Sequence, residues 1–410
     1  MPAHEPTGPI PLSRRISLPL LVLYGLGQTI GAGIYALVGE VAGAAGYGAP
    51  LSFLLAALLA AVTALSYAEL SGRYPRAAGA ALYVQTGLGS ARLGAATGLL
   101  VVLAGLVSSA ALINAFIGQL AAFVPVDRTL AILLVAAALG LIAAWGILES
   151  LLIAGLVTLL EIGGLLLVIG AAWPDLATLP ARWPVLLPEA APGPWLGVLG
   201  GMLLAFYAFL GFEDMVDVAE EVRDVRRNLP LAILATLGLT TVLYVAIMAA
   251  AVLSLPPSEL AASAAPLARL YAHHAGIAGP AISIIGLFAI INGALISLIM
   301  ASRVLYGLSR RGQLPAWLGR VHPGRRTPVL ATILVTAICA VLALIGRLAS
   351  LAETTSLLML GVFALINLSL WRIKRREPAA ASGLPAWLPL TGMALNIGLI
   401  GFRLFSLTTG

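Results

Sequence analysis

The residues of this sequence best suited to chemistry are acids placed inside long apolar stretches. Glu161 lies near the middle of the apolar run Val157–Gly164, with no basic residue nearby in the sequence. Because burial disfavours the charged form of a carboxyl group, this side chain suits reversible binding of a proton. Two alternatives stay open: Glu161 attracts a cationic molecule, or it is a neutral acid with a structural role.

Three further acids border apolar stretches. Glu213 and Asp217 are four residues apart, so on a helix they share one face, where like charges repel and one acid tends to keep its proton. Glu40 follows Gly33 by seven residues and either lines an outer vestibule or faces water at a helix end. We treat Glu40, Glu161, Glu213 and Asp217 as candidate coupling or gating residues. The alternative for Glu213 and Asp217 is that they simply face water near the inner end of their helix.

Glycines mark two positions where the helices carrying these residues could be interrupted. Gly31 and Gly33 bracket Ala32 in the first apolar run, and Gly211 closely precedes Glu213 in the sixth. Unwound backbone inside lipid leaves unpaired N–H and C=O groups, each costing several kcal/mol, unless protein, water or substrate pairs with them. Free helix ends offer N–H groups to an anion and carbonyls to a cation, which suits a zwitterionic amino acid. Interruptions at matching places of two halves indicate the substrate site of an inverted-repeat transporter. The alternative is that Gly31 and Gly33 merely allow close helix packing.

The composition requires a membrane. Of the 410 residues, 60% are hydrophobic and 10% are charged, and the mean hydropathy is +1.04. Soluble domains have ~25% charged residues, so a soluble enzyme, a nucleic-acid binder and a secreted domain are excluded. The single cysteine, Cys339, cannot form an intramolecular disulfide.

Long apolar runs predict eleven membrane spans. Eighteen of the 23 Lys and Arg residues fall on one side if the N-terminus is cytoplasmic, which predicts that orientation, in the inner (plasma) membrane. We expect a cytoplasmic tail (1–16), a first five-helix repeat (17–173), an extracellular loop (174–194), a second repeat (195–371), and a loop with an additional eleventh helix (372–410). The predicted spans are 17–45, 49–71, 82–122, 128–147, 149–173, 195–219, 228–254, 278–308, 328–346, 350–371 and 385–407. The third is too long for one straight span, so it is expected to tilt or to extend past the membrane.

Several motifs together resemble the amino acid–polyamine–organocation (APC) superfamily, and most of all the prokaryotic relatives of cationic amino acid transporters. The resemblance implies an all-α polytopic fold of the LeuT type, a 5+5 inverted repeat with discontinuous helices 1 and 6, and transport by alternating access. Eleven spans depart from the twelve that many members have. The motifs are Gly31–Tyr35, Ser66–Leu70 with Tyr74-Pro75 and Gly79, Phe206–Glu213, Ala219–Val222, Asn228–Pro230, Ala301–Tyr306, Leu314-Pro315 and Arg326–Pro328.

The resemblance also implies a substrate site. Backbone N–H groups around Ala32, Gly33 and Ile34 would hold a carboxylate. Carbonyls near Thr29, Ile30, Phe206 and Phe209 would hold an amino group, and Phe206, Tyr207 or Phe209 would form an aromatic gate. Proton-coupled relatives can carry a lysine in the fifth span near the position of Glu161, so the acid departs from that pattern. Polar residues in apolar runs either line the pocket or form hydrogen bonds between helices. These candidates are Asn114, Asn292, Ser297, Thr354, Thr355 and Ser356.

These features predict a secondary active transporter for an amino acid or related amine, driven by protons or by exchange. An organic-cation or polyamine carrier is the first alternative, and an ion channel, which would need rings of polar residues, is the second. We expect no enzyme activity, because the sequence has no nucleophile motif or Walker loop, and its four histidines lie in tails and loops. No cofactor, metal or nucleic acid is expected; the partners are a small-molecule substrate, the lipid bilayer and, as a candidate, protons. The sequence does not define an oligomeric state.

Overall fold

The computed structural model describes residues 16–76, 79–121, 123–145, 148–276, 279–322, 327–377 and 383–409. Within these ranges, all regular structure is helical apart from one isolated bridge between Ile16 and Val222. Eight helical segments of the described chain are long and apolar enough to cross a bilayer, and three shorter apolar helices accompany them. Together these segments equal the eleven predicted membrane spans in number. The chain is an all-α polytopic membrane protein.

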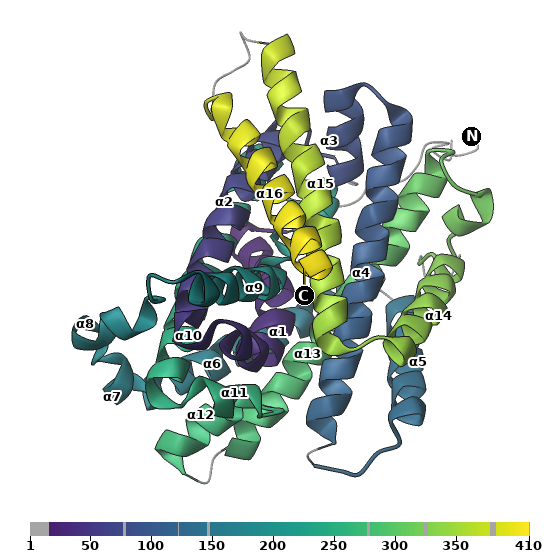
Figure 1. Ribbon diagram of the computed structural model, residues 1–410. Helices are drawn as coiled ribbons and strands as arrows, with labels where there is room; N and C mark the ends of the chain where they lie inside the picture. Colours follow the sequence, from purple (N-terminus) through teal and green to yellow (C-terminus); the bar gives the residue numbers. More distant parts are fainter. Residues whose placement is uncertain are drawn as a thin grey trace, which may run out of the picture.

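The helices follow the predicted spans closely (Figure 1). The predicted loops at 174–194 and 255–277 contain short helices, of which α11 and α12 lie at the end of the bundle opposite α3 (Figure 1). The spanning helices are α1 (Leu18–Ala45), α2 (Ala49–Arg73), α4 (Ala91–Leu120), α5 (Arg128–Trp145), α6 (Leu148–Ala171), α9 (Pro192–Phe209) continued by the 3-10 helix η3 (Phe212–Glu221), α10 (Val225–Ser254), α13 (Gly279–Arg310), α14 (Val329–Ile345), α15 (Leu348–Arg376) and α16 (Trp387–Thr409); the short helices are α3 (Gly79–Leu88), α7 (Trp173–Leu176), α8 (Leu179–Arg182), α11 (Pro257–Ala261) and α12 (Pro266–Ala275).

The third predicted span is two helices, α3 and α4, and not one long helix. Gly89 has φ +70°, a backbone conformation that favours glycine, and it ends α3. Ser90 then begins α4 as its N-cap, with its hydroxyl accepting a hydrogen bond from the Leu93 N–H at 3.3 Å. The expectation of a single tilted helix over 82–122 is therefore wrong.

The first predicted break is absent, because α1 is one continuous α-helix from Leu18 to Ala45. The prediction of a discontinuous first helix is wrong for this structure. Gly33 instead serves close packing: a Cβ atom there would overlap the Cα and Cβ of Ala208 on α9. Gly33 therefore has the role that the alternative interpretation gave it, which is to allow two helices to pack closely.

The second predicted break is confirmed. Helix α9 ends at Phe209, Leu210 is extended with ψ 145°, and Gly211 has φ +124° before η3 begins at Phe212. A side chain at residue 211 would be strained by this φ, and its Cβ would lie 2.9 Å from the backbone carbon of Gln28. Glycine is therefore required where the sixth span is interrupted against α1.

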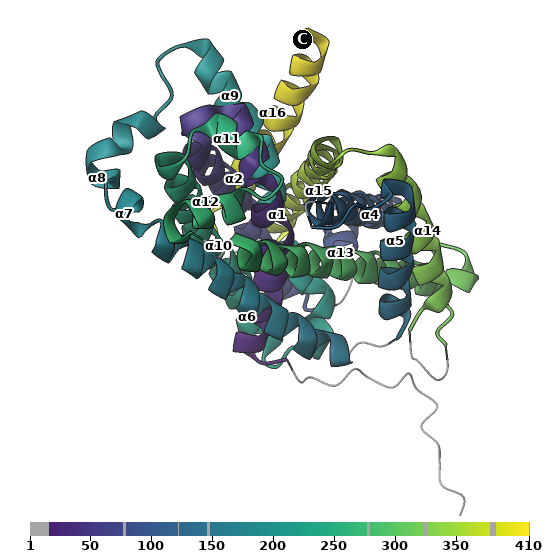
Figure 2. The same cartoon turned by 90° about the horizontal axis from the view of Figure 1, so that it is seen from below.

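The helix contacts repeat after five spans. Helix α1 packs on α9, α2 on α10, α4 on α13, and α5 on α14. The contact of α1 with α10 is matched by that of α9 with α2, and the contact of α6 with α13 by that of α15 with α4. Both views place α1 inside the bundle, whereas α16 lies against α15 and α2 (Figures 1 and 2).

A buried ion pair attaches the start of α16 to the bundle. Lys374 on α15 lies 2.7 Å from Oε1 of Glu69 on α2, and its ammonium group donates to the Leu384 carbonyl at 2.6 Å. The Leu384 N–H donates to Oε2 of Glu69 at 3.3 Å, and Arg73 also pairs with Glu69. These bonds join α2, α15 and the segment before α16.

Candidate functional site

A small cavity lies beside the interruption of the sixth span. Its volume is about 40 Å³, whereas pockets that hold small ligands usually have ~300–1,000 Å³. The surrounding helices must therefore separate before a small molecule can enter. The cavity is lined by Gln28, Thr29, Val101, Ala104, Gly105, Ser108, Tyr207, Leu210, Gly211, Glu213, Asp214, Ser297, Met300, Thr355 and Met359.

Three of the lining residues, Gln28, Glu213 and Asp214, carry hydrogen-bond acceptor oxygens, and we call them together the acceptor wall. The side-chain amide of Gln28 donates to Oδ2 of Asp214 at 2.6 Å, and the Gly211 N–H donates to Oε2 of Glu213 at 2.8 Å. Oε1 of Gln28 is buried and has no hydrogen-bond partner among the described residues. None of the lining residues is basic, so this wall is complementary to a group that donates hydrogen bonds.

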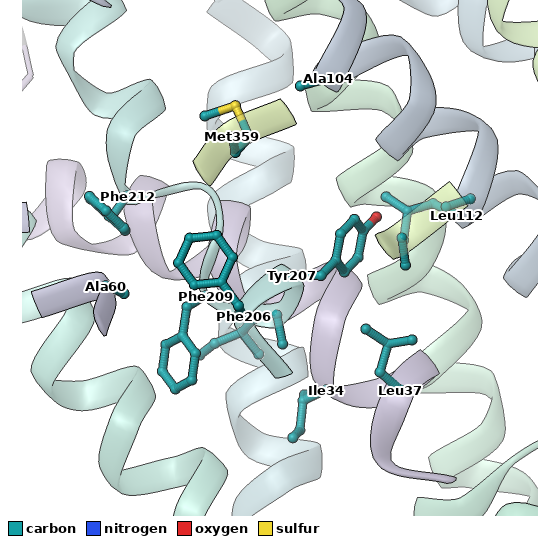
Figure 3. Packing of buried hydrophobic residues seen from close by; sticks show 14 of the residues in the cluster. Ile34, Leu37, Ala60, Ala104, Leu112, Phe206, Tyr207, Phe209, Phe212 and Met359 are labelled. Atoms are coloured by element: carbon teal, nitrogen blue, oxygen red, sulfur yellow. The ribbon is translucent and has the colours of Figure 1, made fainter. Parts of the chain in front are cut away.

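Hydroxyl groups belong to other residues that line the cavity. The hydroxyls of Tyr207 and Ser108 are 2.9 Å apart, and Ser297 and Thr355 also line the cavity. Figure 3 shows Tyr207 directed away from Phe206 and Phe209, toward Leu112. Tyr207 is thus the member of the aromatic trio that reaches the cavity.

Phe206 and Phe209 lie in a buried aromatic cluster. The ring centroid of Phe206 is 5.8 Å from that of Phe363, and the Phe209 ring is 5.2 Å from that of Tyr244. Neither residue lines the cavity. In this form of the protein both rings pack between helices.

Glu161 lies outside the cavity, at a junction of helices α1, α6 and α13. Its side chain is fully buried, and Oε1 accepts a long hydrogen bond of 3.4 Å from the side chain of Asn292. The hydroxyl of Tyr35 donates to the Glu161 carbonyl at 2.7 Å. Oε2 has no hydrogen-bond partner within the described part of the chain. A buried acid with one long hydrogen bond, placed between α1 and α13, is sensitive to any separation of these helices.

Comparison with known proteins assigns the family. The sequence profile described as amino acid permease matches residues 16–408. The chain belongs to the amino acid permease family. An uncharacterized transporter of Mycobacterium tuberculosis is 32% identical over 364 residues, which are 88% of this chain and 80% of the relative.

Two relatives of this permease are named for different substrates. The branched-chain amino acid permease BcaP of Bacillus subtilis is 28% identical over 394 residues, covering 90% of the permease and 82% of BcaP. The vacuolar cationic amino acid transporter 2 of Arabidopsis thaliana is 32% identical over 401 residues, covering 92% of the permease and 62% of that protein. The family relationship establishes a multi-pass membrane transporter.

The α1 residues that were predicted to bind the substrate differ from one another in their surroundings. Thr29 lines the cavity, and its carbonyl accepts a hydrogen bond of 2.7 Å from the hydroxyl of Tyr244. Ile30 and Ile34 are fully buried in the core. Because α1 is continuous, the backbone N–H groups of residues 32–34 lie within a helix, and the side chain of Ala32 lies outside the described residues.

The two predicted asparagines act between helices. Asn114 donates to the Ala343 carbonyl at 3.0 Å and accepts from Arg128 at 2.7 Å, which ties α4 to α5 and α14. Asn292 contacts Glu161 instead of the cavity. Asn114 therefore forms hydrogen bonds between helices, as the alternative interpretation predicted.

The remaining predicted acids and hydroxyls divide between the cavity and its surroundings. Glu213 lines the cavity, Asp217 is half-buried on η3, and Glu40 is exposed. Ser297 and Thr355 line the cavity, whereas Ser356 donates to the Leu203 carbonyl at 3.1 Å and Thr354 is exposed.

Sequence reasoning missed Gln28 and Ser108 as cavity residues. Gln28 is an amide side chain in an apolar run, three residues before Gly31, and that signal could have identified it. Ser108 has a weaker signal, because serine is common between membrane helices.

Proposed function

We propose that the permease is a secondary active transporter that moves an amino acid or a related amine by alternating access. The observation that supports this proposal best is the interrupted sixth span, whose Gly211 lies directly on α1 beside a polar cavity. Interrupted helices at membrane depth are tolerated where they line such a cavity, and they are typical of transporter sites. The names of BcaP and the Arabidopsis relative agree with an amino acid as substrate.

Two inverted five-helix units, residues 17–173 and 195–371, are part of this proposal. The repetition of helix contacts after five spans supports them. The arginine distribution supports a cytoplasmic N-terminus. A location in the plasma membrane is a further part of the proposal. Residues 372–410, with α16, lie outside the repeat.

The substrate site is proposed to form when the cavity opens between α1 and α9. Thr29 and Tyr207 already line the cavity. Opening would release the contact between Gly33 and Ala208, and the segment Ala32–Ile34 of α1 is proposed to face the carboxylate of the substrate. Carbonyls of Ile30, Phe206 and Phe209 would then hold an amino group.

Glu161 is proposed as the proton-binding residue of coupled transport. Support comes from its full burial, its unpaired Oε2 and its place between α1 and α13. Protonation removes a charge that is costly between membrane helices. Binding of a proton would therefore favour the form in which these helices pack closely.

A second candidate is a carrier of organic cations or polyamines. The acceptor wall of Gln28, Glu213 and Asp214 favours it, because that wall suits an ammonium or guanidinium group without requiring a carboxylate. Lysine and cadaverine separate the two candidates, because cadaverine is lysine without its carboxylate. An amino acid carrier is stabilised by lysine or leucine and not by cadaverine in a thermal-shift assay, whereas a cation carrier is stabilised by lysine and cadaverine alike.

Uptake into proteoliposomes tests transport and coupling. Under an imposed pH gradient, we expect accumulation of the stabilising compound by the purified permease. Glu161→Gln retains a group that can accept a hydrogen bond from Asn292 but cannot change charge, so uptake by this variant should lose its dependence on pH. Thr158→Ser, a conservative change one turn before Glu161, is the control. An unchanged pH profile in Glu161→Gln, with a normal rate, would contradict proton coupling at this residue.

A further inference from the structure

The chain folds back against the end of α13. After the last turn of this helix it forms the 3-10 helix η4 (Ala316–Gly319), which packs on α13. The hydroxyl of Ser309 on α13 donates to the Pro315 carbonyl at 2.8 Å. A Cβ atom at Gly319 would lie 2.8 Å from Oγ of Ser309, so the two helices are in direct contact. These contacts hold η4 in a fixed position beside the end of the span.

A second cavity lies between α13 and η4. Its volume is about 670 Å³, within the range of ~300–1,000 Å³ that is usual for sites that bind small ligands. Unlike the cavity beside Gly211, it has room for a ligand group without any separation of helices. The residues that line it are Tyr306, Ser309, Arg310, Ala316, Gly319, Arg320 and Val321. We name it the arginine pocket, because Arg310 and Arg320 are its charged members.

The positive charge of the arginine pocket is not balanced by acids. No acidic residue occurs in the sequence between Glu259 and Glu353, whereas six arginines occur from 303 to 326. Among the residues that the structure describes, no acid lies within ion-pair distance of Arg310 or Arg320. A guanidinium group can donate two parallel hydrogen bonds to one phosphate group. The pocket is therefore complementary to a phosphate.

The apolar residues beside the pocket favour a phosphate that belongs to a lipid. The Trp317 side chain on η4 is 43% exposed, and Val321, which lines the pocket, is 42% exposed. Tryptophan is enriched where a protein crosses the boundary between membrane and water. The pocket adjoins the end of a membrane span, so it lies near the level of the lipid headgroups. A soluble phosphate would gain nothing from these exposed apolar side chains, whereas a lipid brings acyl chains to the same place.

We propose that the arginine pocket binds the phosphate of an anionic lipid headgroup through Arg310 and Arg320, with the hydroxyl of Tyr306 as a further donor. Basic pockets next to membrane spans bind such headgroups. A zwitterionic lipid such as phosphatidylcholine carries its own cation beside the phosphate, so the two arginines disfavour it. The lipid belongs to the cytoplasmic leaflet, and this detail alone rests on the proposed orientation of the permease.

Lipid binding to the purified full-length permease tests the pocket without requiring transport. The protein in neutral detergent is titrated with phosphatidylglycerol or phosphatidylcholine, and native mass spectrometry counts the bound molecules. The test variant is Arg310→Gln/Arg320→Gln. Arg226→Gln/Arg227→Gln is the matched control, because it removes the same charge from two exposed arginines of α10. Arg310→Lys/Arg320→Lys keeps the charge of the pocket and is the second variant.

We expect phosphatidylglycerol to bind the parent more tightly than phosphatidylcholine does. The affinity for phosphatidylglycerol should fall about fivefold for each arginine of the pocket that is replaced by glutamine. The lysine variant and the control should keep most of this affinity. Both arginines of the pocket are exposed, so the glutamine variant should melt at the parent's temperature when no lipid is added.

Three results would contradict the proposal. Equal affinity of the glutamine variant and the control for phosphatidylglycerol would overturn the arginine pocket, because net charge alone would then account for binding. Equal binding of the two lipids by the parent would overturn recognition of an anionic headgroup. Inorganic phosphate is tested at the concentration at which phosphatidylglycerol half-saturates the parent. An equal rise in melting temperature with this phosphate would assign the pocket to a soluble anion instead of a lipid. None of these results depends on uptake, so they are separate from the test of the proposed function.

Discussion

The side-chain amide of Gln28 on α1 donates a hydrogen bond of 2.6 Å to the carboxylate of Asp214 on η3, across 186 residues of sequence. Both residues line the cavity beside Gly211. This bond connects the continuous first span to the interrupted sixth span at the point where a substrate is proposed to bind.

Gln28→Ala should lower the stability of the closed form by ~1–3 kcal/mol, because it leaves the buried Asp214 carboxylate without its donor. Thermal unfolding in detergent measures this loss. Gln28→Glu should lower the melting temperature further near neutral pH, since it places a second acid against Asp214. An unchanged melting temperature in both variants would show that the bond does not stabilise the closed form.

Gly33→Ala should destabilise the protein, because the new Cβ would overlap the backbone of Ala208. From the sequence alone, a bulky residue at this position would be expected to abolish binding while leaving the fold intact. The close contact predicts a folding defect as well, with a cost of ~1–3 kcal/mol or more.

The control for Gly33 is Gly238→Ala on α10, where no atom lies within 4 Å of the added Cβ. This change should leave stability equal or raise it by up to ~1 kcal/mol, because alanine favours helix. Folded yield and melting temperature of the two variants are compared. Equal behaviour would refute the tight contact between α1 and α9.

Tyr67→Phe should raise the stability of the closed form by ~1 kcal/mol or more. The Tyr67 hydroxyl is buried and has no hydrogen-bond partner in the described part of the chain, and such a group costs ~1–3 kcal/mol. Tyr244→Phe is the contrasting variant, because it removes the bond to the Thr29 carbonyl and should lower the melting temperature. Shifts in the same direction for the two variants would contradict this assignment.

Lys374→Met should lower stability by ~1–3 kcal/mol, since it leaves Glu69 with Arg73 as its remaining cationic partner and frees the Leu384 carbonyl. Arg375→Met, one residue further along α15 and exposed in the structure, is the control and should change stability little. Limited proteolysis between α15 and α16 provides a second measurement, because loss of the Lys374 contacts should expose that segment. Equal proteolysis of the two variants would argue against this attachment.

The number and positions of the spans were predictable, because each apolar run is long and bounded by polar or Pro-rich segments. The division at Gly89 was missed, since the apolar residues continue on both sides of it and a single glycine with positive φ leaves only a weak trace in sequence. The break at Gly211 was predicted correctly because two acids, Glu213 and Asp214, follow within three residues, and a continuous helix would carry them into the membrane.

The first span was predicted incorrectly because Gly31 and Gly33 fit two structures equally well. An unwound segment and a close helix contact both need small residues, and the choice depends on Ala208, which lies 175 residues after Gly33 in the sequence. The same reason hid the Gln28–Asp214 bond and the contact of Asn292 with Glu161. Hydrogen bonding between distant helices depends on the tertiary structure. Local sequence patterns therefore identified the polar residues but not their partners.

The small volume of the cavity has a consequence for any measured affinity. A substrate binds only those molecules whose helices have already separated. The observed dissociation constant is therefore the intrinsic constant divided by the fraction of molecules in the separated form. Variants that let these helices separate more readily, without a change to a residue that lines the cavity, should then bind more tightly while melting at a lower temperature. The stability of the closed form and the apparent affinity for substrate are therefore expected to change in opposite directions.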